Sequence, residues 1–364
     1  MNPPRVRFMS LAPGEDGPAV GVAIRRVVDR GWYVLGPEVE AFEHAFAAAC
    51  GAGHAIGVGT GTDAIAIILR ALGIGTGDEV VTTPLSAAYT ALACMMVGAR
   101  PVFADIDPVR LTIDPAAAEA AITPRTAAIL PVHLYGQPAE MPALASIAAR
   151  HHLALVEDCC QAHLATCEGR PVGGFGVAAA YSFYPTKNLG ALGDGGAITT
   201  RDADLASRLR RLRNGGQTDR YHHVEMGVNS RLDDIQAAVL SARLPFLGAW
   251  TAARRARAAQ YRSLLADTFV DVPPECDPGH VYHLFPVLLP DRDRVQSRLE
   301  SAGVETLVHY PVPIPRQRAL ATEQPADCPV ANRVCARILS LPLYPGIPAD
   351  HIDAVSAALR QALV

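Results

Sequence analysis

One lysine lies between an apolar segment and a group of glycines, within residues 180–199 of this 364-residue chain. Lys187 is the candidate nucleophile, because a neutral amine can bind an aldehyde as an imine. Burial next to a cationic group lowers the pKa of a lysine and keeps more of it neutral. Glycines at 190, 193, 195 and 196 allow the backbone to turn tightly and approach a flat ring. A solvated lysine in a surface loop would show the same local pattern. The choice between a catalytic and a surface lysine therefore depends on the rest of the chain.

A glycine-rich segment closer to the N-terminus has the composition of an anion site. Residues 55–63, Ala-Ile-Gly-Val-Gly-Thr-Gly-Thr-Asp, predict a short strand and a loop that opens a helix over Asp63–Leu72. Free N–H groups at the helix N-terminus, together with the hydroxyls of Thr60 and Thr62, can bind a phosphate. The loop lacks the Gly-Lys-Ser/Thr ending of a P-loop, and helix capping alone explains it about as well.

Short apolar strands alternate with helices through the next part of the chain, which is typical of a parallel sheet covered on both faces. Ligands of such sheets bind beyond the carboxyl ends of the strands. Glu157, Asp158 and Gln161 stand at or just past the end of one predicted strand, so we expect them at that crevice. The predicted strands are Glu79–Thr83, Pro101–Ile106, Ala127–Val132 and Leu153–Glu157, and the helices between them are Ala87–Val97, Pro115–Ile122 and Ala139–His151.

The pattern changes towards the C-terminus, beyond a break at Pro273-Pro274. We predict a large domain over residues 1–248, with an irregular N-terminal arm before Gly36, and a smaller α+β domain over residues 249–364. Helices are predicted at Glu40–Cys50 and Asp202–Arg213, and a long helical stretch from about Gly227 to Leu265 is interrupted at Pro245. A strand region at Tyr282–Leu289 follows, with helices at Arg292–Ala302, Ala331–Leu339 and Ala349–Leu363.

Composition narrows the class of function. The formal net charge is −4, and no run rich in lysine and arginine occurs, so nucleic-acid binding is not expected. The uncharged segment Val80–Ala99 is divided by Pro84, which argues against a membrane helix. Met1–Leu11 lacks the apolar part of a signal peptide, so we expect a cytoplasmic protein. Eight cysteines show no zinc-type spacing, and no metal site is expected.

Eight motifs in a fixed order resemble one known family, the DegT/DnrJ/StrS-type sugar aminotransferases. These are pyridoxal-phosphate enzymes of fold type I, and the resemblance runs from about Trp32 to Val355. It implies an α/β fold with a mostly parallel central sheet covered by helices, and a smaller C-terminal α+β domain. The motifs occupy residues 59–63, 98–105, 131–137, 157–163, 182–190, 193–196, 229–233 and 341–345.

The resemblance implies a role for each residue that could bind the cofactor. Lys187 would hold pyridoxal 5′-phosphate as an imine, Asp158 would pair with the ring nitrogen, and Gln161 would approach the ring hydroxyl. The phosphate would be held by Gly61, Thr62 and Ser182. Asn229 would reach the phosphate in the neighbouring subunit, which implies a homodimer with shared active sites.

The resemblance also implies the reaction, in which an amino group moves from glutamate or glutamine to a keto sugar, most plausibly a nucleotide-linked one. Two departures from the family pattern lie near the substrate. Ala87 or Ala88 stands where an aromatic residue usually stacks on the ring, and Pro315-Arg316 stands where a histidine is common. A cyclitol ketone as acceptor, or a non-catalytic regulatory protein that binds cofactor or sugar, therefore stays open. Lys187 argues against a related sugar dehydratase, because those enzymes have histidine in its place.

Overall fold

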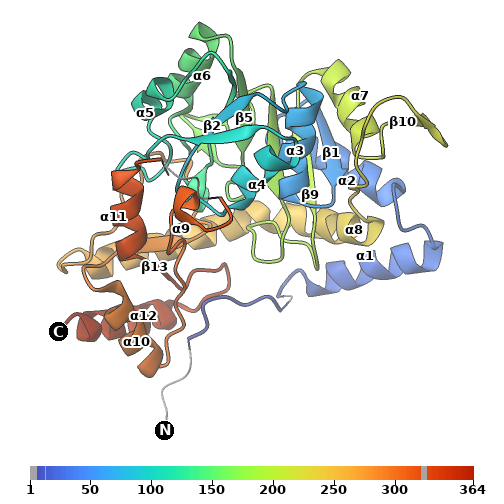
Figure 1. Ribbon diagram of the computed structural model, residues 1–364. Coiled ribbons are helices and arrows are strands. Elements are labelled where there is room, and N and C mark those ends of the chain that lie inside the picture. Colours follow the sequence, from blue (N-terminus) through green and yellow to red (C-terminus); the bar gives the residue numbers. More distant parts are fainter. Residues whose placement is uncertain (1–5, 13, 321–325) are drawn as a thin grey trace.

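The computed structural model describes residues 6–12, 14–320 and 326–364. Within these residues the large domain contains a seven-stranded sheet with strand order β1-β9-β8-β5-β4-β2-β3 (Figure 1). All neighbouring pairs are parallel except those of β9, which runs antiparallel to β1 and β8. The strands are β1 (His54–Val58), β2 (Glu79–Thr82), β3 (Arg100–Phe103), β4 (Thr126–Leu130), β5 (Ala154–Asp158), β8 (Ala178–Ser182) and β9 (Gly196–Thr200).

Helices cover both faces of this sheet, as the alternating sequence pattern predicts. Side chains of β8 show the division, because Ala179 and Tyr181 pack into one apolar cluster while Ala178 and Ala180 pack into the other. The first face is covered by α2 (Pro37–Cys50), α5 (Pro115–Ala120), α6 (Met141–Arg150) and α8 (Asp234–Arg243). The second is covered by α3 (Gly61–Ala71), α4 (Tyr89–Met96) and α7 (Ala203–Leu212).

The C-terminal part forms a separate apolar cluster around a two-stranded antiparallel sheet of β12 (Phe285–Leu288) and β13 (Ile338–Leu341). The long helix α9 (Leu247–Leu265) joins it to the large domain and contributes Ala258, Tyr261 and Leu265 to its core (Figure 1). The proposed boundary at residue 248 falls at the first turn of this helix and stays a prediction. The remaining helices are α10 (Arg292–Ser301), α11 (Pro329–Arg337) and α12 (Ala349–Leu363).

Local structure differs from the sequence prediction at several points, including the following three. The N-terminal arm is not wholly irregular, because it contains α1 (Gly17–Arg30), which packs Ala23 and Val27 against Ala238 of α8. The helix predicted from Gly227 begins only at Asp234, and residues 229–233 are loop. Ile338 and Leu339 belong to β13 rather than to a helix.

The smaller elements lie in the connecting loops. These elements are the strands β6 (Thr166–Cys167), β7 (Arg170–Pro171), β10 (Gln217–Asp219) and β11 (His222–His223), and the 3₁₀ turns Leu134–Gly136, Leu244–Phe246 and Ile314–Arg316.

None of the helices in the described ranges has the length and apolarity required to cross a membrane.

Candidate active site

The N-terminus of α3 lies beside the carboxyl end of β8. Thr60 caps the helix by accepting a hydrogen bond from the Asp63 N–H (3.0 Å between Oγ1 and N). Gly196 pairs with both Val58 and Ser182 in the sheet. A Cβ on Gly196 would lie 2.5 Å from the Thr60 carbonyl oxygen, so the helix start can approach β9 only over a glycine.

The same close packing brings Gly61 to Ser182. An added Cβ on Gly61 would lie 2.8 Å from the Ser182 Cβ and 2.8 Å from the Cys160 Sγ. Thr62 is the next residue of the helix, so the predicted phosphate-binding residues of this chain share one corner of the site. Backbone N–H groups of a first helical turn and a serine hydroxyl form a suitable site for a phosphate dianion.

Asp158 ends β5 at this same edge of the sheet and is almost fully buried. Its Oδ2 accepts a hydrogen bond from the Thr90 hydroxyl at 2.8 Å, and its Oδ1 accepts one from the Cys160 N–H at 3.1 Å. These hydrogen bonds fix the orientation of the carboxylate and stabilise its charge in a buried position. The carboxylate can therefore pair with a cationic group of a ligand. Nothing in the sequence around Thr90 pointed to this partner.

Lys187 lies on the loop that follows β8, and it is the only lysine of the whole chain. Burial lowers the pKa of its amine, while Cys160 and Asp158 oppose this effect. The other 31 positively charged side chains are arginines, which stay protonated and cannot act as nucleophiles at ordinary pH. The chain therefore has one side-chain amine, placed beside Asp158.

Gln161 connects this site to the loop between α10 and the 3₁₀ turn Ile314–Arg316, which contains His309 and Tyr310. Its Oε1 accepts a hydrogen bond from the Tyr135 N–H at 2.8 Å, and its Nε2 donates to the Tyr310 hydroxyl at 3.1 Å. The Tyr135 hydroxyl donates to the His309 carbonyl at 2.5 Å. Sequence reasoning missed Tyr310, although it lies in the segment His309–Pro313 that borders one of the family departures.

Asn188 connects the Lys187 loop to the small domain. Its Nδ2 donates to the Val281 carbonyl at 3.0 Å, and its Oδ1 lies 3.1 Å from the His283 Nδ1. Both residues are almost fully buried, and burial followed by the charge of Lys187 lowers the pKa of His283 well below its ordinary value. A neutral His283 that donates from Nδ1 therefore holds the residue next to Lys187 in place.

Asn229 differs from the other predicted site residues in its exposure. Its side chain is exposed, and among the described residues no hydrogen bond to it is found. The neighbouring Ser230 is buried and joins the loop to the α3 corner, since its hydroxyl donates to Asp63 Oδ2 at 2.8 Å and accepts from the Gly59 N–H at 2.9 Å. Asn229 thus stands on a rigid loop with its side chain facing outwards, and its reach into a second subunit stays a prediction.

The residues predicted at the position that covers the cofactor ring lie at the start of α4. Ala87 and Ala88 are half-buried at the start of α4, and Tyr89 is 63% exposed. Pro315 is buried in a 3₁₀ turn. Both departures from the family pattern therefore lie in residues that the structure describes. Neither of them supplies an aromatic side chain beside Asp158.

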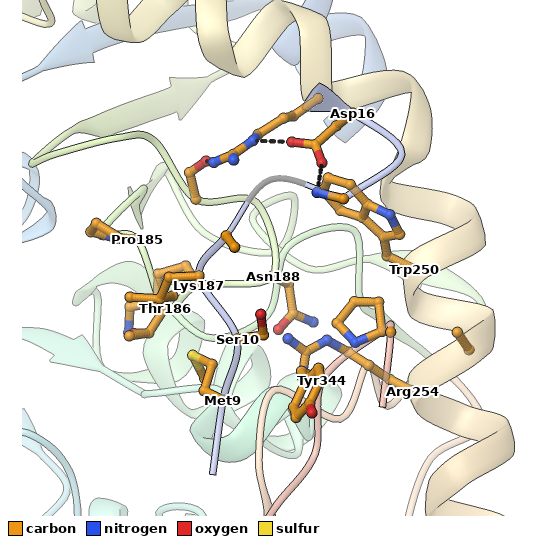
Figure 2. A pocket seen from close by; sticks show the side chains of 18 of the residues that line it. Met9, Ser10, Asp16, Pro185, Thr186, Lys187, Asn188, Trp250, Arg254 and Tyr344 are labelled. Carbon is orange, nitrogen blue, oxygen red and sulfur yellow. Dashed lines mark hydrogen bonds and ion pairs between the residues drawn. The ribbon is translucent and has the colours of Figure 1, made fainter. Parts of the chain in front are cut away.

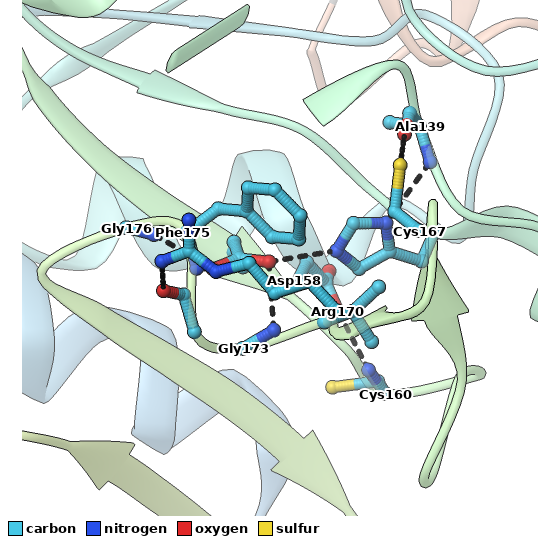
Figure 3. Close-up of polar contacts among 12 residues, drawn as sticks. Ala139, Asp158, Cys160, Cys167, Arg170, Gly173, Phe175 and Gly176 are labelled. Atoms are coloured by element: carbon cyan, nitrogen blue, oxygen red, sulfur yellow. Dashed lines mark hydrogen bonds and ion pairs between the residues drawn. The ribbon is translucent and has the colours of Figure 1, made fainter. Parts of the chain in front are cut away.

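Next to Asp158 a second polar cluster surrounds the fully buried Glu157. Figure 3 shows Gly173, Phe175 and Gly176 of this cluster beside Asp158. His133, Glu157 and Cys159 are close enough together to hold a metal ion. The carboxylate, however, accepts from the N–H groups of Gly173, Phe175 and Gly176 at 2.7–2.8 Å and lies 3.3 Å from His133 Nε2. We assign the cluster to holding the 173–176 loop against β5.

Lys187 also lines a cavity of about 610 Å³ that is bounded by the N-terminal segment, the loop after β8 and α9 (Figure 2). The N-terminal segment around Ser10 crosses one side of the cavity, and α9 forms the opposite side with Trp250 and Arg254. Asn188 and Tyr344 lie between them. The cavity gives a small ligand a place to bind next to the amine.

A family model described as the DegT/DnrJ/EryC1/StrS aminotransferase family matches residues 19–360. The chain belongs to this family. The predicted family and the fold type I α/β architecture are therefore confirmed, as is the prediction that the protein is an enzyme that transfers amino groups.

Individual members of the family cover nearly the whole chain. The chain is 47% identical to dTDP-3-amino-3,4,6-trideoxy-alpha-D-glucose transaminase of Streptomyces venezuelae, over 98% of this chain and 96% of the relative. The crystal structure of S. venezuelae DesV in complex with a ketimine intermediate superposes with a TM-score of 0.95 at 47% identity, covering 99% and 98% of the two chains. NtdA of Bacillus subtilis, solved with bound cofactor PMP, superposes with a TM-score of 0.94 at 31% identity, covering 100% of this chain and 86% of NtdA.

Proposed function

We propose that the protein is a pyridoxal-phosphate-dependent aminotransferase that moves an amino group from glutamate or glutamine to a nucleotide-linked keto sugar. The observation that carries the proposal is the position of the only lysine of the chain, half-buried beside Asp158 and next to the corner formed by Gly61 and Ser182. An aldehyde, a ring nitrogen and a phosphate would each meet a matching group in this arrangement. The name of the S. venezuelae relative supports a nucleotide sugar as acceptor.

The residues fit pyridoxal phosphate by their chemistry. When bound, the cofactor supplies a ring that takes up the electrons released as a proton leaves the donor's Cα. Asp158 would keep a proton on the ring nitrogen, and Gly61, Thr62 and Ser182 would hold the phosphate. The Lys187 amine would bind the aldehyde and, once released, move the proton at the reacting carbon. Its lowered pKa increases the neutral fraction that both roles require.

A homodimer with shared active sites is part of this proposal. The exposed Asn229 and several exposed apolar side chains support it, because exposed apolar side chains that gather together often mark a protein–protein interface. They gather in two loops, as Trp32, Tyr33 and Val34, and as Tyr221, Val224 and Met226.

The direct test is cofactor binding by the purified protein. We expect an absorption band at about 410–430 nm, the range of an imine of this cofactor, and its loss in Lys187→Ala. Because the chain has one lysine, reduction with borohydride should label a single internal peptide that contains residue 187. A protein that stays colourless with added cofactor, or a label on the N-terminal amine alone, would refute the proposal.

The reaction itself is tested by separating its two halves. Glutamate or glutamine alone should bleach the band, and a keto sugar should restore it, as ping-pong kinetics require. Asp158→Asn should retain the cofactor but slow the first half by about 100-fold or more, because the ring takes up electrons less well. A panel of 3-keto and 4-keto nucleotide sugars with a cyclitol ketone would then identify the acceptor class.

A further inference from the structure

Two buried arginines line the cavity beside Lys187, and their partners differ. Arg243 donates from Nε to Asp16 Oδ2 at 2.8 Å, which neutralises its charge. Arg254 is only 3% exposed and forms no ion pair with any described residue. The remaining acid on the cavity wall, Glu15, is exposed and accepts a hydrogen bond from the Trp250 Nε1 at 3.0 Å.

Arg254 is held in place, but its charge is not balanced. Its Nη1 donates to the carbonyls of Tyr282, His283 and Leu343 at 3.0–3.2 Å, while its Nε has no hydrogen-bond partner within the described residues. Burial alone lowers the pKa of the guanidinium to about 10. A buried cation without an anion is unfavourable, and such a group is usually completed by a ligand or an acid.

Lys187 and Arg254 line the same cavity, on opposite sides of it (Figure 2). A donor amino acid has to present its Cα to Lys187, so the rest of the donor must extend away from it. A carboxylate suits Arg254, since a guanidinium binds it more strongly than it binds an amide.

We propose that the cavity is a carboxylate site in which Arg254 receives the side-chain carboxylate of a dicarboxylic amino donor. The inference rests on the proposed function and deepens it, because it selects glutamate over glutamine as donor.

Calorimetry with glutarate tests the site without any reaction. Glutarate has the two carboxylates of the donor but no amine, so its binding to the cofactor-free protein does not depend on catalysis. We expect glutarate to bind and its neutral diamide, glutaramide, to bind at least about tenfold more weakly. Equal binding of the two compounds would overturn the proposal.

Ala253 offers a variant that keeps Arg254 and its three carbonyl contacts. Ala253 lines the same cavity, so Ala253→Glu should place an internal carboxylate there and weaken glutarate binding by about tenfold or more. Ala253→Gln has the same size without the charge, and we expect it to remain within about threefold of the natural protein. Equal glutarate affinity of these two variants would refute the site. Arg254→Met should also lose binding, and its melting temperature shows whether it folds.

Kinetics of the holoenzyme identify the source of the carboxylate. Ala253→Glu should raise KM for glutamate, compared with Ala253→Gln, and leave KM for the keto sugar unchanged. A change in the keto-sugar KM alone would assign Arg254 to an acceptor phosphate and overturn the donor assignment. A protein that binds glutarate through Arg254 yet never binds pyridoxal phosphate would refute the proposed function and leave the anion site standing.

Discussion

At the scale of single residues, Lys187 shows how a reactive group is kept at a cost to stability. Burial lowers the pKa of its amine, so the protonated form is penalised in the folded protein. The unfolded chain binds that proton more tightly, and folding stability should therefore rise with pH, up to the ordinary lysine value near 10.5. Active sites often carry this kind of local instability.

Lys187→Met should therefore stabilise the cofactor-free protein at neutral pH. For a chain of this size, each kcal/mol gained should raise the melting temperature by about 2 °C. The gain should shrink as pH rises towards 10.5, because the natural protein loses its buried charge there. Thermal melts between neutral pH and pH 10 measure it. Lys187→Arg, which stays charged, serves as the control, and a Met variant that melts below the natural protein at neutral pH would contradict the argument.

Thr90 is a second residue-scale case, since its hydroxyl donates a hydrogen bond to the buried Asp158 carboxylate. Thr90→Val keeps the shape and removes the donor, so the buried carboxylate should lose about 1–3 kcal/mol of stabilisation. We expect the pyridoxal-phosphate dissociation constant to rise and the turnover to fall, each by about tenfold. Absorbance titration and steady-state kinetics measure the two quantities. Thr90→Ser restores the hydroxyl and should behave like the natural protein. Identical Val and Ser variants would remove Thr90 from this role.

At the scale of elements, the site depends on how closely α3 approaches β9. Gly196 lies where a Cβ would meet backbone atoms of Thr60 and Gly61 at 2.5–2.8 Å. Backbone cannot rotate away as a side chain can, so any larger residue must displace the N-terminus of α3. The first turn of that helix is the predicted phosphate site.

Gly196→Ala should therefore weaken pyridoxal-phosphate binding by about tenfold or more, because the phosphate-binding N–H groups shift. Gly193→Ala, in the loop that precedes β9, is the matched control, since its Cβ would meet only the flexible side chain of Gln236, at 3.2 Å. Absorbance titration of both variants gives the comparison. A Gly196 variant that binds the cofactor as tightly as the Gly193 variant would separate α3 from phosphate binding.

At the scale of the whole molecule, the outward position of Asn229 predicts complementation between subunits. A purified heterodimer of Lys187→Ala and Asn229→Leu chains would combine both defects in one site and leave the other intact. We expect about half the turnover of the natural dimer, as two-fold symmetry requires. If Asn229 acts within its own subunit, the heterodimer should instead have no more than half the activity of the Asn229→Leu homodimer. Differently tagged chains, co-expressed and purified through both tags, supply the sample.

Much of the fold was predictable because strand and helix patterns are local. Helix α12 has the predicted bounds, and the strand that ends at Asp158 was placed to within a residue. The prediction was wrong for α1 and for residues 229–233, because contacts with distant segments determine the local structure in both places. Ala23 and Val27 of α1 pack on Ala238 of α8. Ser230 holds residues 229–233 in a loop by its hydrogen bond to Asp63, although the local sequence favours a helix in that segment.

The sequence by itself determined the family, the one side-chain amine and the acid 29 residues before it, because these depend on residue identity and order. Only the tertiary structure decided that Thr90 supports Asp158, that Gly196 admits α3, and that Arg254 lacks an acidic partner among the described residues. These features join segments up to about 140 residues apart, and no local pattern encodes them. Burial and charge balance depend on packing between distant segments, so only the tertiary structure shows them.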